Sequence, residues 1–186
     1  MSTAAAGSEL ETKWVRLAQA GDQQAFGQLI LIYWEGVAGM VYRMCGDMHL
    51  AEDVAQDTFL RAWQHLKGYE PRTSLRSWLY RIAANRAVDL LRREKPAADL
   101  EQLDPPDAAV PPEAQTILNE RQAKVQAAVL SLPLASRSVL ILREYQGLSY
   151  REISEALDIP VGTVMSRLNF ARLKLAAALQ DEMEGA

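Results

Sequence analysis

Apolar residues recur at spacings of three and four along most of this 186-residue chain, and this periodicity restricts the possible folds more than any other feature. The pattern runs through residues 8–90 and returns over residues 114–183. Side chains three or four positions apart share one face of an α-helix, whereas a half-buried strand alternates at every second residue. Strand-type alternation is absent from the pattern, so the sequence predicts an all-α fold.

The helical pattern stops over residues 94–113, a segment with five prolines and six acidic side chains against one lysine. Proline lacks a backbone donor and breaks helices, and few apolar residues here keep a helical spacing. We therefore expect two small helical domains, at 8–93 and 114–183, joined by an acidic, proline-rich linker at 94–113. Each domain is of marginal size for a single core, and we expect the four tryptophans to help fill the two cores.

The net charge of −4 hides a strong segregation of charge. Residues 72–93 contain six arginines and one aspartate, and residues 163–174 contain three basic side chains and no acidic one. Such local basic stretches indicate surfaces for a polyanionic partner, although the chain as a whole is acidic.

Cysteine and histidine are too few for a metal site of the common kinds. The single cysteine, Cys45, excludes an intrachain disulfide and a cysteine-rich zinc site, and the two histidines complete no cluster. We expect no metal, no cofactor and no catalytic residue. The N-terminal segment lacks the features of a secretory signal, and no apolar run is expected to span a membrane. The sequence therefore predicts a cytoplasmic protein without membrane insertion.

The segment 149–175 has the pattern of a helix-turn-helix. Ser149 and Glu152 have the spacing of a capping box that begins a short helix, and only residues 158–161 separate that helix from a second one. The second helix has polar and basic groups opposite its apolar stripe, as a DNA-reading helix requires. An ordinary surface helix with solvated charges would show the same pattern, so periodicity alone leaves both interpretations open. The apolar stripe comprises Val164, Leu168, Ala171 and Leu175.

A second basic helix, at 74–93, follows the loop sequence KGYEPRTS at 67–74. A loop aromatic such as Tyr69 can stack on an unpaired base, and arginines on the adjacent helix can hold the backbone of a single strand. The alternative is that the aromatic residues lie in the core and the arginines are solvated. For Trp78 we favour the core, and for Tyr69 we favour a functional role.

The helix at 51–63 has an acidic and amide face formed by Glu52, Asp53, Gln56 and Asp57. A pair of carboxylates can serve acid–base or metal chemistry, but no histidine, cysteine or lysine completes such a site here. A face that docks a basic region of a partner protein explains the pattern better.

These three segments together resemble bacterial sigma factors of the extracytoplasmic-function group. The matching sequences are AEDVAQDTFLRAW (51–63), SWLYRIAANRAVDLLRR (77–93) and LSYREISEALDIPVGTVMSRLNFARLKL (148–175), in the order that the family has them. The resemblance covers residues 12–180. It implies a promoter-specificity subunit of RNA polymerase, with sigma region 2 in the first domain and sigma region 4 in the second.

The resemblance also implies roles for individual residues and partners. The expected partners are the clamp and flap of bacterial core RNA polymerase, promoter DNA and an anti-sigma factor. The residues expected to bind the polymerase clamp are Glu52, Asp53, Gln56, Asp57, Leu60 and Trp63. Those expected to meet the separated strand of the −10 element are Arg61, Tyr69, Arg76, Tyr80, Arg81 and Asn85. Those expected to read the −35 element are Thr163, Met165, Ser166, Arg167, Asn169, Phe170, Arg172 and Lys174.

Two positions depart from the family's pattern. The family usually has a basic residue where this chain has Met165, and commonly has arginine where it has Phe170. Both differences remove a positive charge from the reading face, so we expect weaker phosphate contacts and an unusual −35 sequence, with apolar contacts to thymine methyl groups. The main alternative function is a helix-turn-helix regulator that binds palindromic DNA without polymerase. A nucleic-acid enzyme is a third class, disfavoured because the sequence offers no metal or acid–base cluster.

Overall fold

The structure, a computed structural model, describes residues 3–70, 74–94 and 120–184, and every regular element in these ranges is helical. The all-α prediction is therefore confirmed. The predicted linker lies outside the described residues, apart from Glu94 at the end of a helix. The first domain contains α1 (Thr3–Gln19), α2 (Gln23–Cys45), α3 (Met48–His65), η1 (Leu66–Gly68) and α4 (Leu75–Glu94). The second contains α6 (Glu120–Leu130), α7 (Leu134–Leu140), η3 (Ile141–Tyr145), α8 (Tyr150–Leu157) and α9 (Val161–Glu184).

The breaks between helices fall where the sequence places glycine, aspartate and proline. Asp22 caps α2 and accepts hydrogen bonds from the backbone N–H groups of Gln24 and Ala25, at 2.8 and 3.1 Å. Gly46 ends α2 in the left-handed conformation, with φ of 77°, which glycine adopts without steric cost. Asp47 then caps α3. These local signals set the ends of α2 and the start of α3.

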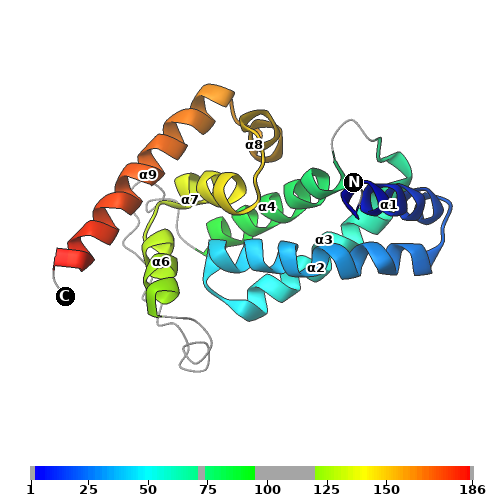
Figure 1. Ribbon diagram of the computed structural model, residues 1–186, viewed down its shortest axis with the longest axis horizontal. Coiled ribbons are helices and arrows are strands. Elements are labelled where there is room, and N and C mark those ends of the chain that lie inside the picture. The colour runs from blue at the N-terminus through cyan, green and yellow to red at the C-terminus, as the bar shows by residue number, and fades with distance from the viewer. Residues whose placement is uncertain (1–2, 71–73, 95–119, 185–186) are drawn as a thin grey trace.

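Helix α2 is the central element of the first domain and packs against α1, α3 and α4. Figure 1 shows α2 and α4 running lengthwise through this domain, with α1 at the end far from the second domain. Val37, Met40, Val41 and Met44 of α2 are completely buried. By length and composition alone α2 is long and apolar enough to cross a membrane, with a mean hydropathy of 1.2, a test that the core helix of a globular domain also passes. Its role in this core accounts for that composition.

The buried apolar residues of the two domains form one continuous cluster rather than two separate cores. Helices α6, α7 and η3 of the second domain contact α2, and α8 packs against α4. Helix α9 lies along the outer side of the second domain, against α6, α7 and α8 (Figure 1). All four tryptophans are only partly buried and pack around the cluster, whose fully buried apolar residues are leucine, isoleucine, valine, methionine and alanine.

Candidate nucleic-acid and protein-binding surfaces

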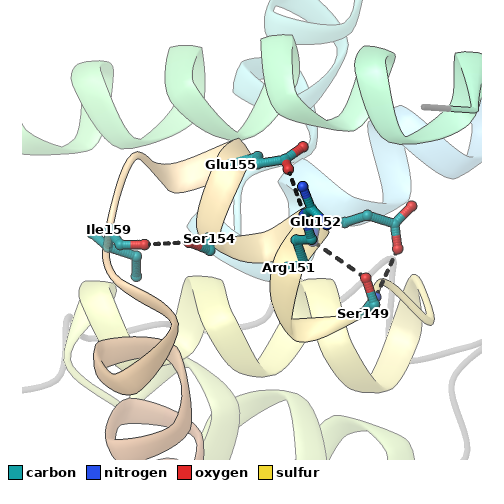
Figure 2. A network of polar contacts seen from close by, with 6 residues as sticks. All are labelled: Ser149, Arg151, Glu152, Ser154, Glu155 and Ile159. Atoms are coloured by element: carbon teal, nitrogen blue, oxygen red, sulfur yellow. Dashed lines mark hydrogen bonds and ion pairs between the residues drawn. The ribbon is translucent and has the colours of Figure 1, made fainter. Parts of the chain in front are cut away.

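Helices α8 and α9 form the helix-turn-helix that the sequence predicts. The Ser149 hydroxyl accepts a hydrogen bond from the Glu152 backbone N–H, and a Glu152 carboxylate oxygen accepts one from the Ser149 N–H, at 3.2 and 2.8 Å (Figure 2). Asp158 ends α8 in the left-handed conformation, with φ of 52°. The Ser154 hydroxyl donates to the Ile159 carbonyl at 2.6 Å and holds the turn. These bonds fix the angle at which α9 leaves α8.

One face of α9 is anchored in the core and the other is open. Val164, Leu168 and Ala171 are almost completely buried, as the apolar stripe predicts. On the open face, Met165 and Phe170 are 54% and 42% exposed. Large apolar side chains therefore stand on the face that the sequence predicts to read the −35 element. Among the predicted −35 residues, those that the structure leaves exposed are Met165, Ser166, Asn169, Phe170, Arg172 and Lys174, and the partly buried ones are Thr163 and Arg167.

Arg172 has an acidic partner that sequence spacing did not reveal. Its Nη2 and Nε atoms lie 2.5 and 3.1 Å from a carboxylate oxygen of Glu144, at the end of η3. This bond raises the pKa of Arg172. The pair ties α9 to η3, and a phosphate that binds Arg172 must compete with Glu144 for it.

An apolar groove lies between α2 and α3 and includes three of the predicted polymerase-binding residues. Gln56, Leu60 and Trp63 line the groove from α3, and it has a volume of about 300 Å³. Leu60 is 56% exposed. Sequence reasoning missed the contribution of α2 to this site, because periodicity shows which side of a helix is apolar but not which two helices meet. The α2 residues that line the groove are Gln23, Phe26, Ile30 and Trp34.

The acidic members of the predicted polymerase-binding set lie apart from that groove lining. Glu52 and Asp53 are exposed on the first turns of α3. Asp57 is half-buried and holds two arginines, with one carboxylate oxygen 3.0 Å from Nε of Arg61 and 2.7 Å from Nε of Arg86. Arg86 belongs to α4, so Asp57 links α3 to α4. Its carboxylate is therefore engaged within the chain.

Helix α4 exposes Arg76, Arg81 and Asn85 but buries Tyr80. The Tyr80 hydroxyl fits against Gly36 of α2, where a Cβ atom would stand only 2.5 Å from it. Tyr80 is 3% exposed, so its ring is not available for stacking on a base in this conformation. Instead, Tyr80 supports the guanidinium of Arg76, which lies 5.4 Å from the ring centroid.

Tyr69 lies at the start of the loop that precedes α4. Its ring is partly buried and packs at 5.0 Å from Trp78, between ring centroids. The Gln19 side-chain amide donates to the carbonyl oxygens of Leu66 and Tyr69, at 3.1 and 2.9 Å, which fixes the backbone at this corner. Burial raises the pKa of Tyr69. The rest of this loop, residues 71–73, lies outside the described part of the chain.

The second domain covers part of the α4 face. Ser77, Trp78 and Arg81 of α4 line one narrow crevice together with Glu152 and Glu155 of α8. The Ser77 hydroxyl donates to Glu152 at 2.5 Å, and this bond is the main cause of the lowered pKa of Glu152. Thus the predicted −10 surface and the helix-turn-helix meet in this structure.

Within residues 3–70, 74–94 and 120–184, no group of three or more histidine, cysteine, aspartate or glutamate side chains could hold a metal ion. The thiol of Cys45 is mostly buried, and burial raises its pKa to about 11, so it stays protonated at neutral pH.

Comparison with known proteins agrees with the geometry in both domains. Residues 30–96 match the family model Sigma-70 region 2, and residues 122–175 match Sigma-70, region 4. The ECF RNA polymerase sigma factor SigW of Bacillus subtilis is 35% identical over 181 residues, covering 91% of this chain and 96% of SigW. The RNA polymerase sigma-H factor of Pseudomonas aeruginosa is 36% identical over 183 residues, covering 92% and 95% of the two chains.

Two solved structures extend the match to the folded chain. CnrH, solved in complex with the cytosolic domain of CnrY, superposes with a TM-score of 0.69 at 30% identity, covering 92% of this chain and 98% of CnrH. The sigma factor RpoE, solved with the anti-sigma factor NepR from Bartonella quintana, has the same fold, with a TM-score of 0.65 at 22% identity, covering 83% and 96%.

Proposed function

Because this chain belongs to the extracytoplasmic-function group of the sigma-70 family, we propose that its exposed surfaces divide the work of promoter recognition between its two domains. The chain is a promoter-specificity subunit that binds core RNA polymerase and recognises the −35 and −10 elements for transcription initiation. The observation that carries the residue-level proposal is the open face of α9, opposite a stripe that is anchored in the core. A helix held in this way presents its N-terminal half to the major groove.

In the second domain, the outward residues of α9 read the −35 element. Ser166 and Asn169 can exchange hydrogen bonds with base edges, while Met165 and Phe170 contact thymine methyl groups. Arg167, Arg172 and Lys174 stand near the phosphates, and Thr163 lies at the entry of the helix. This domain also meets the polymerase flap.

In the first domain, the exposed face of α4 meets the separated −10 strand. Arg76, Arg81 and Asn85 supply positive charge and hydrogen bonds, and Tyr69 supplies an aromatic ring at the entry to the helix. Arg61, on α3, is paired with Asp57, so we assign it a weaker contact. Tyr80 contributes indirectly, because its buried ring packs against the guanidinium of Arg76 and holds it in position.

The groove between α2 and α3 docks the polymerase clamp. Leu60 and Trp63 offer apolar area and Gln56 offers an amide. Glu52 and Asp53, exposed on the first turns of α3, can attract basic side chains of the clamp. An apolar centre with a polar rim is the usual anatomy of a specific protein interface. Asp57 positions α3 against α4 rather than contacting the clamp, since two arginines already hold its carboxylate.

The protein acts by binding and strand separation rather than by catalysis, works in the cytoplasm, and is controlled by an anti-sigma factor. Support for the last point is that RpoE, which has the same fold, was solved with an anti-sigma factor. The linker at 94–113 spans at most about 70 Å when extended. The −10 and −35 elements are separated by several turns of duplex, so the linker has to be extended when both elements are bound. Its acidic residues suit a basic channel on the polymerase.

Transcription from a random promoter library tests the proposal. The purified protein is mixed with core RNA polymerase and the library, and the transcripts are sequenced. Transcripts that share fixed −10 and −35 motifs are expected. If the protein bound duplex DNA but failed to join core polymerase, the regulator function would replace the sigma function and the assignment of the groove would be wrong.

A further inference from the structure

Gln19, the last residue of α1, connects this helix to the corner of the chain that leads into α4. Its side-chain amide nitrogen has two N–H donors, and both are used here. One donates to the carbonyl oxygen of Leu66 at 3.1 Å and the other to that of Tyr69 at 2.9 Å, 47 and 50 positions away in the sequence. The backbone N–H of Tyr69 donates to the same Leu66 carbonyl at 3.0 Å, so two hydrogen bonds meet on this turn.

Holding this backbone also holds the Tyr69 ring. Leu66 is 1% exposed and anchors one end of the turn in the core. The ring of Tyr69 packs against Trp78 of α4, with 5.0 Å between ring centroids. Tyr69 therefore has a defined position before any strand binds. Such pre-positioning favours recognition, because a loop that is ordered only on binding loses conformational entropy at that moment.

Helix α1 is itself attached firmly to the first domain. The hydroxyl of Tyr33, on α2, donates to a carboxylate oxygen of Glu11 at 2.6 Å, and Tyr33 is 9% exposed. The negative charge of Glu11 also contributes to the raised pKa of Tyr69, so α1 lies close to Tyr69 about two turns before Gln19 as well. Helix α1 precedes residues 30–96, the part of the chain that matches region 2, and yet it supports the corner at Tyr69.

We propose that Gln19 is a positioning residue for recognition of the −10 element, which holds the backbone of Tyr69 so that its ring meets an unpaired base in one place. The proposal rests on the −10 function proposed above for Tyr69. Gln19 acts through two carbonyl groups and does not touch DNA in this role. Without its amide, the turn would sample several positions, and the affinities for the correct and the incorrect base would become more alike. Specificity is the difference between those affinities, so discrimination is the property that Gln19 controls.

Three substitutions separate the hydrogen bonds of Gln19 from its other properties. Gln19→Met removes both donors and keeps the length and the good helix propensity of the side chain. Gln19→Lys is the rescue variant, because an ammonium group has three donors and can serve both carbonyl oxygens. A cation is also favourable at the last residue of a helix. The matched control is Gln28→Met, which makes the same change at an exposed position of α2.

Competition between two promoters in one reaction measures discrimination. Holoenzyme assembled from the full chain and core RNA polymerase receives equal amounts of a promoter with the −10 motif selected by the promoter library and a promoter with one −10 base pair changed. The ratio of the two transcripts is recorded for each −10 position in turn, and a second series changes the −35 motif instead. Both promoters meet the same polymerase and carry the same phosphates. The ratio is therefore independent of how much of a variant is active and of the charge that lysine adds.

Gln19→Met is expected to lower the ratio at one or more −10 positions by about fivefold or more, the factor that corresponds to losing one typical hydrogen bond. It should leave the −35 ratio unchanged, because Gln19 lies in the first domain and the helix-turn-helix lies in the second. Gln19→Lys and Gln28→Met are both expected to match the wild type at both elements.

The other outcomes would overturn the proposal in distinguishable ways. An unchanged −10 ratio in Gln19→Met would remove the positioning role and leave the sigma function standing. An equal loss at both elements would make the role of Gln19 purely structural. A −10 loss that Gln19→Lys failed to restore would exclude the two hydrogen bonds as its cause. If the wild-type holoenzyme started transcription at no promoter in the library, the sigma function and the positioning role would both fail.

Discussion

Placing positive charge at positions 165 and 170 should change how −35 binding depends on salt. Both residues lie on the open face of α9, 54% and 42% exposed, where a long basic side chain can reach a phosphate. Met165→Lys and Phe170→Arg also keep residues of good helix propensity in α9, so the fold should be unaffected. The two changes can be made singly and together.

The magnitude follows from counterion release. Each phosphate that a side chain neutralises steepens the slope of log affinity against log salt by about 0.9. Raising salt from about 50 to 200 mM therefore weakens binding by an additional factor of about 3.5 for one new contact and about 12 for two. At the lower salt concentration the double variant should bind duplex DNA more tightly than the wild type.

Fluorescence anisotropy with a labelled duplex, carrying the −35 motif selected by the promoter library, measures both quantities. Met165→Gln is the matched control, because it changes the polarity of the side chain without adding charge. If the double variant has the wild-type slope and affinity, positions 165 and 170 do not face the phosphates, and the orientation proposed for α9 on DNA would be wrong.

Three further predictions concern stability and polymerase binding. Arg137→Ala leaves the buried carbonyl groups of Met44 and Leu132 without a donor, and each loss costs about 1–3 kcal/mol of folding stability. The thermal midpoint should therefore fall by several degrees, and that of Arg137→Lys should fall less. Equal midpoints for the wild type and Arg137→Ala, measured by circular dichroism, would contradict this expectation. The pKa of Glu152 is lowered, chiefly by the Ser77 hydroxyl, so its stabilising effect is complete above pH 4.5 and is lost as the pH falls through the folded value. The wild type should therefore lose thermal stability more steeply between pH 5 and 3 than Glu152→Gln, and parallel curves would count against the Ser77 contact. Leu60→Glu should weaken polymerase binding by about tenfold or more, because it puts a charge into an apolar interface; unchanged binding by a normally folded variant would remove the groove from the interface.

Local features of the fold were predictable because they depend on neighbours in the sequence. The capping box of Ser149 and Glu152, the break at Gly46 and the buried stripe of α9 each follow from residues within one or two turns of one another. Hydrogen-bonding side chains and helical periodicity act over this short range, so their pattern carries over directly into structure.

Features that join distant segments were not predictable in the same way. Tyr80 is buried because Gly36, on another helix, leaves space for its hydroxyl. Asp57 is engaged because α4 brings Arg86 to it, and half of the groove between α2 and α3 comes from α2. Each depends on which helices pack together, and a periodic pattern shows an apolar face without naming the helix that covers it.

The continuous apolar cluster across the two domains limits how freely they can be exchanged between relatives. Residues on both sides of the interface, such as Gly46 and Leu130, fit one another at close range, so they form a matched pair. A chimera that joined residues 1–93 to the second domain of another family member would keep each DNA-reading helix but lose this match. Its promoter preference could follow the new domain while its resting conformation and regulation did not. Engineering a new specificity into this chain therefore calls for grafting the outward face of α9 alone.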